Sequence, residues 1–100
     1  MLPTASQLII FCDSIIGKPL VTQLRNKVFS VDVVAGSYYL VVGSSGQRRK
    51  IDSNEKITQL IALLANTGSQ RPTKYRDITF NASYLLELIR QWQIRASEGG

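Results

Sequence analysis

Histidine is absent from this chain of 100 residues, and cysteine occurs only once, as Cys12. Without histidine, the side chain that most often transfers protons near neutral pH is missing. A single cysteine cannot form an internal disulfide, which fits a reducing compartment. Cys12 lies in the apolar run 8–12, where we expect a small buried side chain and not a nucleophile. These absences argue against an enzyme.

Long hydrophobic runs are also missing. The apolar run near the N-terminus is short, is followed by Asp13 and has no basic segment before it. It is too short to span a bilayer and does not have the form of a secretory signal peptide. We therefore expect a soluble, intracellular protein of the cytoplasm with no membrane partner.

The seven acidic residues do not form a pattern that is typical of catalysis or metal binding. No two of them have the helical spacing i,i+4, and Asp52 and Glu55 are explained by capping of a helix. We therefore expect no catalytic residue, no metal site and no cofactor. An enzyme would need a pocket in which Asp13, Asp32 or Asp77 converge.

Positive charge, by contrast, is abundant and concentrated in one stretch. Residues 1–45 carry three Lys/Arg and two Asp/Glu, residues 46–76 carry seven and two, and residues 77–100 carry two and three, which gives the net charge of +5. Concentrated positive charge raises the local density of anions and speeds their encounter with the protein. The middle stretch therefore indicates a polyanionic partner. Its cations are Arg48, Arg49, Lys50, Lys56, Arg71, Lys74 and Arg76.

Size and composition indicate a single domain over residues 1–100, with a frayed tail at 96–100. Apolar residues make up 44% and charged residues 19% of the chain, as in folded globular proteins. The glycine- and serine-rich stretch 43–46 is too short to link two domains. We expect one modest hydrophobic core.

The N-terminal segment predicts a helix over about 5–16, because Thr4 and Gln7 form a capping box and the apolar residues that follow have helical spacing. The alternative is a strand over residues 8–12 that opens a βαβ unit. Pro19 is suited to a first helical position, and the residues after it predict a short second helix over about 19–27.

Alternation of apolar and polar residues predicts a small antiparallel sheet with strands at about 28–34, 38–43 and 47–51. Glycine-containing turns separate the three segments, so the simplest arrangement is a meander. A further short strand is expected at 78–80.

Two more amphipathic helices are expected after the sheet, at about 53–66 with Asp52 as N-cap, and at about 81–95 with Asn81 as N-cap. The core face of the last helix carries Leu85, Leu88, Ile89 and Trp92. Three helices and a small sheet predict an α+β fold in which amphipathic helices cover one face of the sheet.

The first candidate site is the cationic run Arg48, Arg49 and Lys50 after the glycine- and serine-rich turn. Arginine forks and free backbone amides match phosphate oxygens, but the glycine-lysine pattern of a Walker loop is missing. If this run is extended, Arg48 and Lys50 share one face and Arg49 lies on the other. The alternative is an ordinary hairpin followed by a solvated edge strand.

The second candidate site is the loop that contains Arg71, Lys74, Tyr75 and Arg76. Cations with an aromatic ring are typical of loops that grip single-stranded nucleic acid, where the ring stacks on a base. The alternative is a solvated loop with Tyr75 folded back onto the core. The intervening helix is about 20 Å long, so the two cationic segments lie either side by side or at opposite ends.

A third candidate is the pair Tyr38 and Tyr39, which point to opposite faces of a strand. One ring is expected in the core, and an exposed one could stack a base. The core or cross-strand interpretation is favoured, because the signature of the RNA-binding sheets that use such rings is missing.

The hypothesis from the sequence is a small non-enzymatic binding domain that contacts nucleic-acid phosphates through 47–51 and 71–76. The alternative is a protein–protein interaction module, such as an adaptor, inhibitor or subunit, that uses the C-terminal helix or a sheet edge. In that case an apolar surface around Leu86 and Ile94 would bind a protein partner or form a homodimer.

Overall fold

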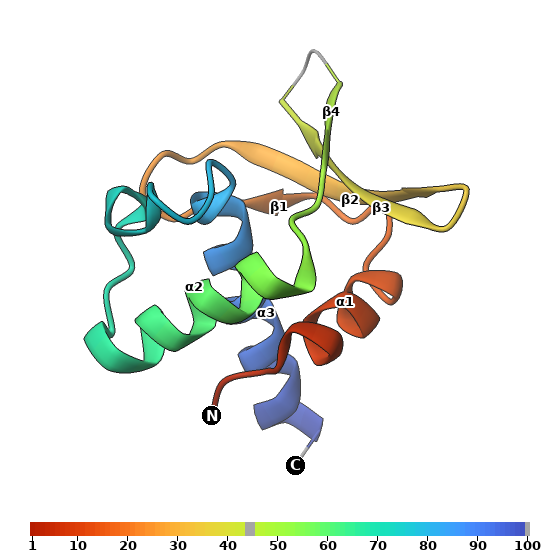
Figure 1. The fold of residues 1–100 in the computed structure, drawn as a ribbon. Coiled ribbons are helices and arrows are strands. Elements are labelled where there is room, and N and C mark those ends of the chain that lie inside the picture. The colour runs from red at the N-terminus through yellow and green to blue at the C-terminus, as the bar shows by residue number, and fades with distance from the viewer. Residues whose placement is uncertain (44–45, 100) are drawn as a thin grey trace.

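The computed structural model describes residues 1–43 and 46–99 and shows a four-stranded sheet with helices on one side (Figure 1). Two helices and a turn of 3-10 helix, η1, follow the sheet, and one helix precedes it. The α+β class predicted from the sequence is confirmed. The elements are α1 (Ala5–Asp13), β1 (Leu20–Val21), β2 (Val28–Val34), β3 (Ser37–Val42), β4 (Gln47–Lys50), α2 (Asn54–Thr67), η1 (Pro72–Tyr75) and α3 (Ala82–Gly99).

The strands form an antiparallel meander in the order β1-β2-β3-β4. The two-residue turn Ala35-Gly36 joins β2 to β3, and its residues have positive φ angles of 52° and 79°. This conformation matches the right-handed twist of a hairpin, and glycine adopts it without strain. The predicted strands at 28–34, 38–43 and 47–51 are confirmed to within one residue at each end.

The predicted short helix over 19–27 is wrong, because the chain there adds the edge strand β1 to the sheet. Leu20 pairs with Phe29 and is buried. The return turn is closed by Thr22, whose hydroxyl accepts a hydrogen bond from a backbone amide. Leu24 is 61% exposed, so the apolar spacing that indicated a helix does not mark a buried face.

α1 begins as the sequence predicts. The Thr4 hydroxyl accepts a hydrogen bond from the Gln7 amide, and the Gln7 side chain accepts one from the Thr4 amide. The helix ends earlier than predicted, because Ile16 leaves it and forms a parallel bridge with Val31 of β2. The competing interpretation of residues 8–12 as a strand is wrong.

α2 begins one residue later than its predicted cap implies. Ser53, not Asp52, is the N-cap, and its hydroxyl accepts a hydrogen bond from the Lys56 amide. The Asp52 carboxylate accepts hydrogen bonds from the side chains of Thr79 and Asn81 instead. Asp52 therefore ties the start of α2 to the turn that precedes α3.

α3 confirms the helix predicted over 81–95, but it is longer, since the tail expected to fray is helical as far as Gly99. The short strand predicted at 78–80 is wrong. The amides of Ile78 and Thr79 both donate to the carbonyl of Tyr75, and this geometry makes a turn.

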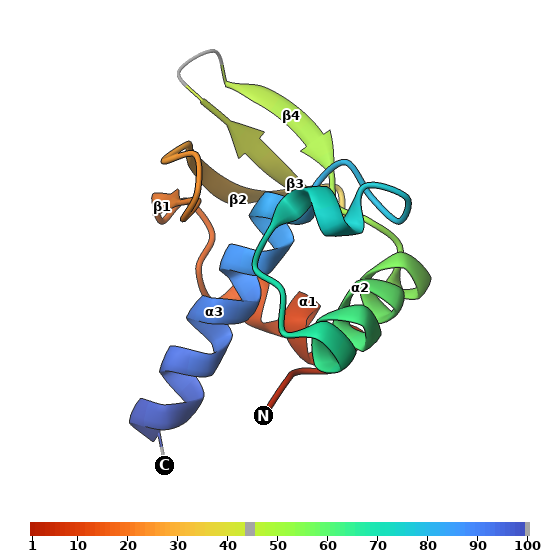
Figure 2. The ribbon, with the colours of Figure 1, turned by 90° about the vertical axis from the view of Figure 1, so that its left-hand side faces the viewer.

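All three helices lie on the same side of the sheet in both views (Figures 1 and 2). α3 meets the sheet at its N-terminal end, where the rings of Tyr84 and Phe29 lie edge to face with centroids 5.1 Å apart. No helix in the described part of the chain is long and apolar enough to cross a membrane. The largest fully buried side chains are Leu8, Phe29, Leu40, Ile57, Leu60, Tyr75, Leu85, Leu88 and Ile89.

Candidate nucleic-acid interface

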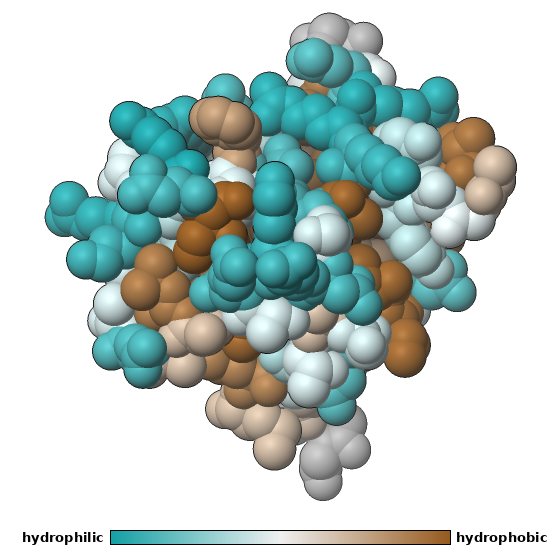
Figure 3. All heavy atoms as spheres, viewed as in Figure 1, coloured by the Kyte–Doolittle hydropathy of each residue, from teal (hydrophilic) through white to brown (hydrophobic). Residues whose placement is uncertain are grey.

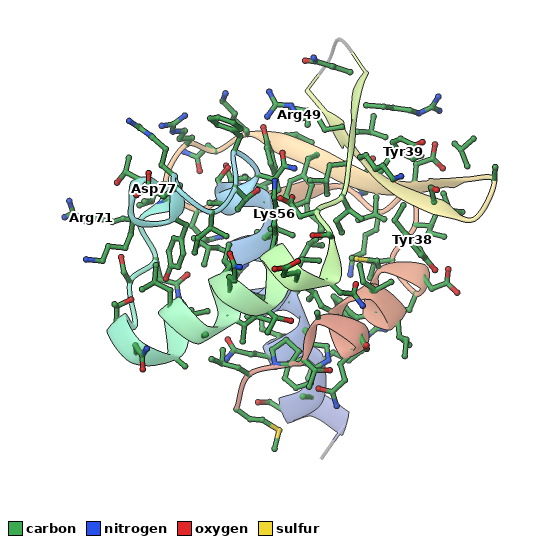
Figure 4. The ribbon with its side chains drawn as sticks, viewed as in Figure 1. Tyr38, Tyr39, Arg49, Lys56, Arg71 and Asp77 are labelled. Atoms are coloured by element: carbon green, nitrogen blue, oxygen red, sulfur yellow. The ribbon has the colours of Figure 1, made fainter. Side chains whose placement is uncertain are left out.

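The two cationic segments predicted from the sequence do not merge into one surface. Arg49 lies beside β4, whereas Arg71 points away from the molecule on the side of η1 (Figure 4). Hydrophilic side chains dominate the part of the surface around the sheet in the same view (Figure 3). The contacts of each cation therefore decide whether it is available to bind an anion.

In β4, the cations are divided between the two faces of the sheet as predicted for an extended strand. Arg48 pairs with Val41 on the helix-free face, and its guanidinium is 3.0 Å from the Asp32 carboxylate. This exposed ion pair offsets part of the charge of Arg48 but contributes little stability. Arg49 points to the helix side, where its guanidinium carbon is 5.9 Å from the centroid of the Tyr84 ring. A cation over an aromatic face is an attractive contact.

Tyr75, expected as a possible stacking group, is fully buried in the core. Its hydroxyl donates a hydrogen bond of 2.6 Å to the carbonyl of Ser69. A ring in this position cannot reach a base, so the stacking role is wrong for Tyr75. The alternative, in which the ring folds back onto the core, is confirmed.

A groove of about 200 Å³ lies at the start of α3, between the β1–β2 turn and η1. Arg25 from that turn and Arg76, which directly follows η1, both line it. Phe80 lines it as well and is 88% exposed. Its remaining lining residues are Pro72, Thr73, Thr79, Ala82 and Ser83.

The groove is held in place by contacts on both sides of Phe80. Before it, Thr79 is buried and donates both its amide to Tyr75 and its hydroxyl to Asp52. After it, the Asn81 side chain donates to the same carboxylate. The buried ring of Tyr75 thus anchors η1 and places Arg76, while Asp52 fixes the turn that exposes Phe80.

Three cations from separate elements surround the start of α3. Arg25 and Arg76 line the groove, and Arg49 lies over Tyr84, next to the lining residue Ser83. Among the described residues, the ion pairs are Arg48–Asp32 and Arg90–Glu87, so these three cations have no carboxylate partner within 4 Å.

Three carboxylates lie near the groove. Asp52 is engaged by Thr79 and Asn81, and Asp77 is exposed beside Arg76. Glu87 lines an adjoining cavity together with the groove residues Pro72 and Ser83. They reduce the net positive charge of this surface without forming an ion pair with its cations among the described residues.

Sequence reasoning missed one of the two cations of this groove and its aromatic ring. Arg25 lies outside the cationic stretch 46–76, and Phe80 was assigned to a strand. Neither has a local signal of function, because only the antiparallel return of β1 to β2 and the turn after η1 bring them together.

Tyr38 and Tyr39 point to opposite faces, as predicted, and both are half-buried. Tyr38 packs at the edge of the core, and its hydroxyl donates a 2.7 Å hydrogen bond to the Asp13 carboxylate. This bond, together with desolvation and the Asp13 charge, raises the pKa of Tyr38. Tyr39 lies on the helix-free face between Asp32 and Lys50, its cross-strand neighbours.

The other titratable groups have structural surroundings. Burial raises the pKa of Cys12 to about 12, which keeps it a thiol and confirms it as a buried side chain. Glu87 is buried and accepts hydrogen bonds from Arg90, Gln23 and Gln91, and the bond to Arg90 raises the pKa of that guanidinium. No three Cys, Asp or Glu side chains are grouped to hold a metal within residues 1–43 and 46–99.

Of the two residues at which an apolar surface is expected, Ile94 is exposed and Leu86 is buried. Leu86 is only 5% exposed, because it packs under the β1–β2 turn and lines a cavity with Leu24 and Gln70. Ile94 is 38% exposed. Other exposed apolar residues are Leu24, which lines the same cavity as Leu86, Ile10 on α1, and Val21, Val28 and Val34 on the helix-free face of the sheet.

Comparison with protein-family models, curated proteins and solved structures finds no significant match to this chain. The groove at the start of α3 brings together groups that could contact a ligand. Guanidinium groups and hydroxyls supply hydrogen-bond donors for an anion, and an exposed ring supplies a flat apolar surface.

Proposed function

We propose that this chain is a small non-enzymatic binding domain that contacts nucleic-acid phosphates through the groove at the start of α3. The observation that carries the proposal is the position of Arg25 and Arg76 on one groove. Arg49 lies over Tyr84 in the first turn of α3, and none of the three cations forms an ion pair among the described residues. Guanidinium groups form paired hydrogen bonds to phosphate oxygens.

A polymer of phosphates fits this surface better than a single small anion. The three cations come from a turn, from β4 and from the end of η1, and two of them line the groove while the third lies over Tyr84. The net charge of +5 attracts any polyanion. Contacts of this kind position a nucleic acid and carry little sequence information.

The remaining predicted cations have a smaller part in this proposal. Lys50, Arg71 and Lys74 are exposed and form no ion pair with another described residue, so they add to the positive field that speeds encounter. Arg48 contributes less, because Asp32 already neutralises part of its charge.

The test is a binding titration of a fluorescent single-stranded oligonucleotide, followed by anisotropy at low salt. The variant Arg25→Gln/Arg76→Gln removes the two cations that line the groove. The matched control, Lys18→Gln/Arg95→Gln, removes the same charge near the other end of α3, about 20 Å along the helix from Ala82.

We expect the groove variant to lose about tenfold or more in affinity and the control to lose much less, since two phosphate contacts are removed only in the first. Equal losses in the two variants would show a general charge effect with no localised site. An unchanged affinity of the groove variant would contradict the proposal.

A second candidate function is a protein-interaction module that binds an extended acidic segment of a partner along β4. β4 is an edge strand of the sheet. The amide of Ile51 donates to the carbonyl of Tyr38, and in an antiparallel pair only every second residue is hydrogen-bonded to its partner strand. Arg48 and Lys50 lie in the other positions, so their backbone groups point away from β3. Unpaired backbone groups at an edge accept a further strand, and the cationic side chains favour an acidic one.

A peptide of alternating valine and glutamate is the probe for this second function. Slower amide exchange at Arg48 and Lys50 on addition of the peptide would support strand addition. Unchanged exchange would contradict it. The groove variant Arg25→Gln/Arg76→Gln should behave as the wild type here, which separates the two functions.

A further inference from the structure

Phe80 is the most exposed aromatic residue in the described chain, at 88%. Phe80 lines the groove together with Arg76 and Ala82, and its neighbours Thr79 and Asn81 are both held by the Asp52 carboxylate. The backbone on either side is therefore fixed, and the ring is presented to solvent by a constrained turn. An apolar ring held outward in this way offers a flat face to a ligand without any rearrangement of the fold.

The surroundings of the ring restrict that partner. Two guanidinium groups and the hydroxyls of Thr73 and Ser83 line the same groove. A purely apolar partner would have to cover these polar groups without satisfying them, which is unfavourable. A ligand that combines a flat aromatic surface with anionic groups satisfies the ring and the cations together.

We infer that the groove binds single-stranded nucleic acid, with backbone phosphates on Arg25 and Arg76 and one base stacked on Phe80. This inference rests on the proposed function and adds to it the strandedness of the ligand. In a duplex the faces of the bases are covered by their neighbours, whereas a single strand can turn one base out. Every base has such a face, so stacking tolerates any sequence.

The experiment compares one oligonucleotide as a single strand and as a blunt duplex, against the wild type and two variants at position 80. Phe80→Ala removes the ring, and Phe80→Trp keeps a ring that also reports stacking by fluorescence. Since Phe80 is exposed, neither variant should lose the fold, and far-UV circular dichroism checks this. Wild-type fluorescence, which comes from Trp92, is the baseline.

The wild type should bind the single strand more tightly than the duplex. Phe80→Ala should weaken single-strand binding by about 5- to 150-fold, the range for one base stacked on an aromatic ring, and should leave duplex binding unchanged. Phe80→Trp should retain the affinity, and its added fluorescence should be quenched by the strand.

Wild-type affinity of Phe80→Ala for the single strand, or an equal loss for strand and duplex, would overturn the inference. The proposed function would still stand if Arg25→Gln/Arg76→Gln weakened binding to both forms. If that groove variant bound both forms as the wild type does, the proposed function itself would fail. Adenosine monophosphate serves as a competitor at equal phosphate concentration. If it displaced the strand, the groove would be assigned to a free nucleotide, and the inference of a single-stranded ligand would be overturned.

Discussion

Replacement of Tyr75 by phenylalanine tests whether this tyrosine stabilises the core or contacts a ligand at the surface. Loss of a buried, hydrogen-bonded hydroxyl lowers stability, whereas loss of a solvent-exposed hydroxyl does not. Tyr75 is fully buried, and its hydroxyl donates a 2.6 Å hydrogen bond to the carbonyl of Ser69. Tyr75→Phe keeps the ring and leaves that half-buried carbonyl without this donor. One hydrogen bond of this kind contributes about 1 kcal/mol to the free energy of unfolding.

For a domain of 100 residues, a loss of about 1 kcal/mol lowers the melting temperature by about 4–8 °C. Urea unfolding is followed by the fluorescence of Trp92, the single tryptophan, and the slope of the transition should not change. Tyr39→Phe is the matched control, since Tyr39 is half-exposed on the helix-free face and its replacement should change stability by less than about 0.5 kcal/mol.

The oligonucleotide affinity of Tyr75→Phe should equal that of the wild type, because the hydroxyl lies in the core and the position of Arg76 is kept by the ring. A variant with unchanged stability and reduced affinity would refute the buried position of Tyr75. It would also restore the interpretation of this tyrosine as a surface group that contacts the ligand.

Two further predictions concern the helix cap and the buried thiol. Ser53→Ala should lower the free energy of unfolding by about 1 kcal/mol and Ser53→Asp should not, since the Ser53 side chain caps α2; equal urea midpoints for the two variants would contradict this. The free energy of unfolding should fall as the pH rises from about 9 towards 12. The thiol of Cys12 ionises near pH 9.0 in the unfolded chain and only near 12 in the folded one. The folded state therefore binds one more proton than the unfolded state in this interval, and a rise in pH favours unfolding. Cys12→Ala should reduce this slope, and an identical slope in variant and wild type, measured by urea unfolding at several pH values, would show that Cys12 is not the cause.

Local patterns in the sequence predict most of the fold. The capping box at Thr4, the alternation through β2 and the apolar stripe of α2 each act within a few residues, so they are visible without knowledge of the tertiary structure. β1 is not predicted, because a strand of two residues is too short to show an alternation of apolar and polar side chains. Leu20 becomes a strand residue only through its pairing with Phe29.

The candidate site was predictable only in part, because its members are joined by tertiary packing. Arg76 was found from local charge, but Arg25 and Phe80 reach the groove through the β1–β2 turn and the turn before α3. Tyr75 is ambiguous in sequence, since tyrosine is intermediate between the buried and the exposed residue types. Asp52 was misassigned by one position, because both it and Ser53 are good caps.

The dependence of oligonucleotide affinity on salt tests the central claim, that cations around the start of α3 bind phosphates. Three phosphate contacts on a single strand predict a slope of about −2 for log affinity against log salt, or roughly a 20-fold loss between 50 and 200 mM salt. Arg25→Gln/Arg76→Gln should reduce the slope to about −0.7, the value for one remaining contact. A wild-type affinity that does not change with salt, or a variant slope equal to that of the wild type, would contradict the claim.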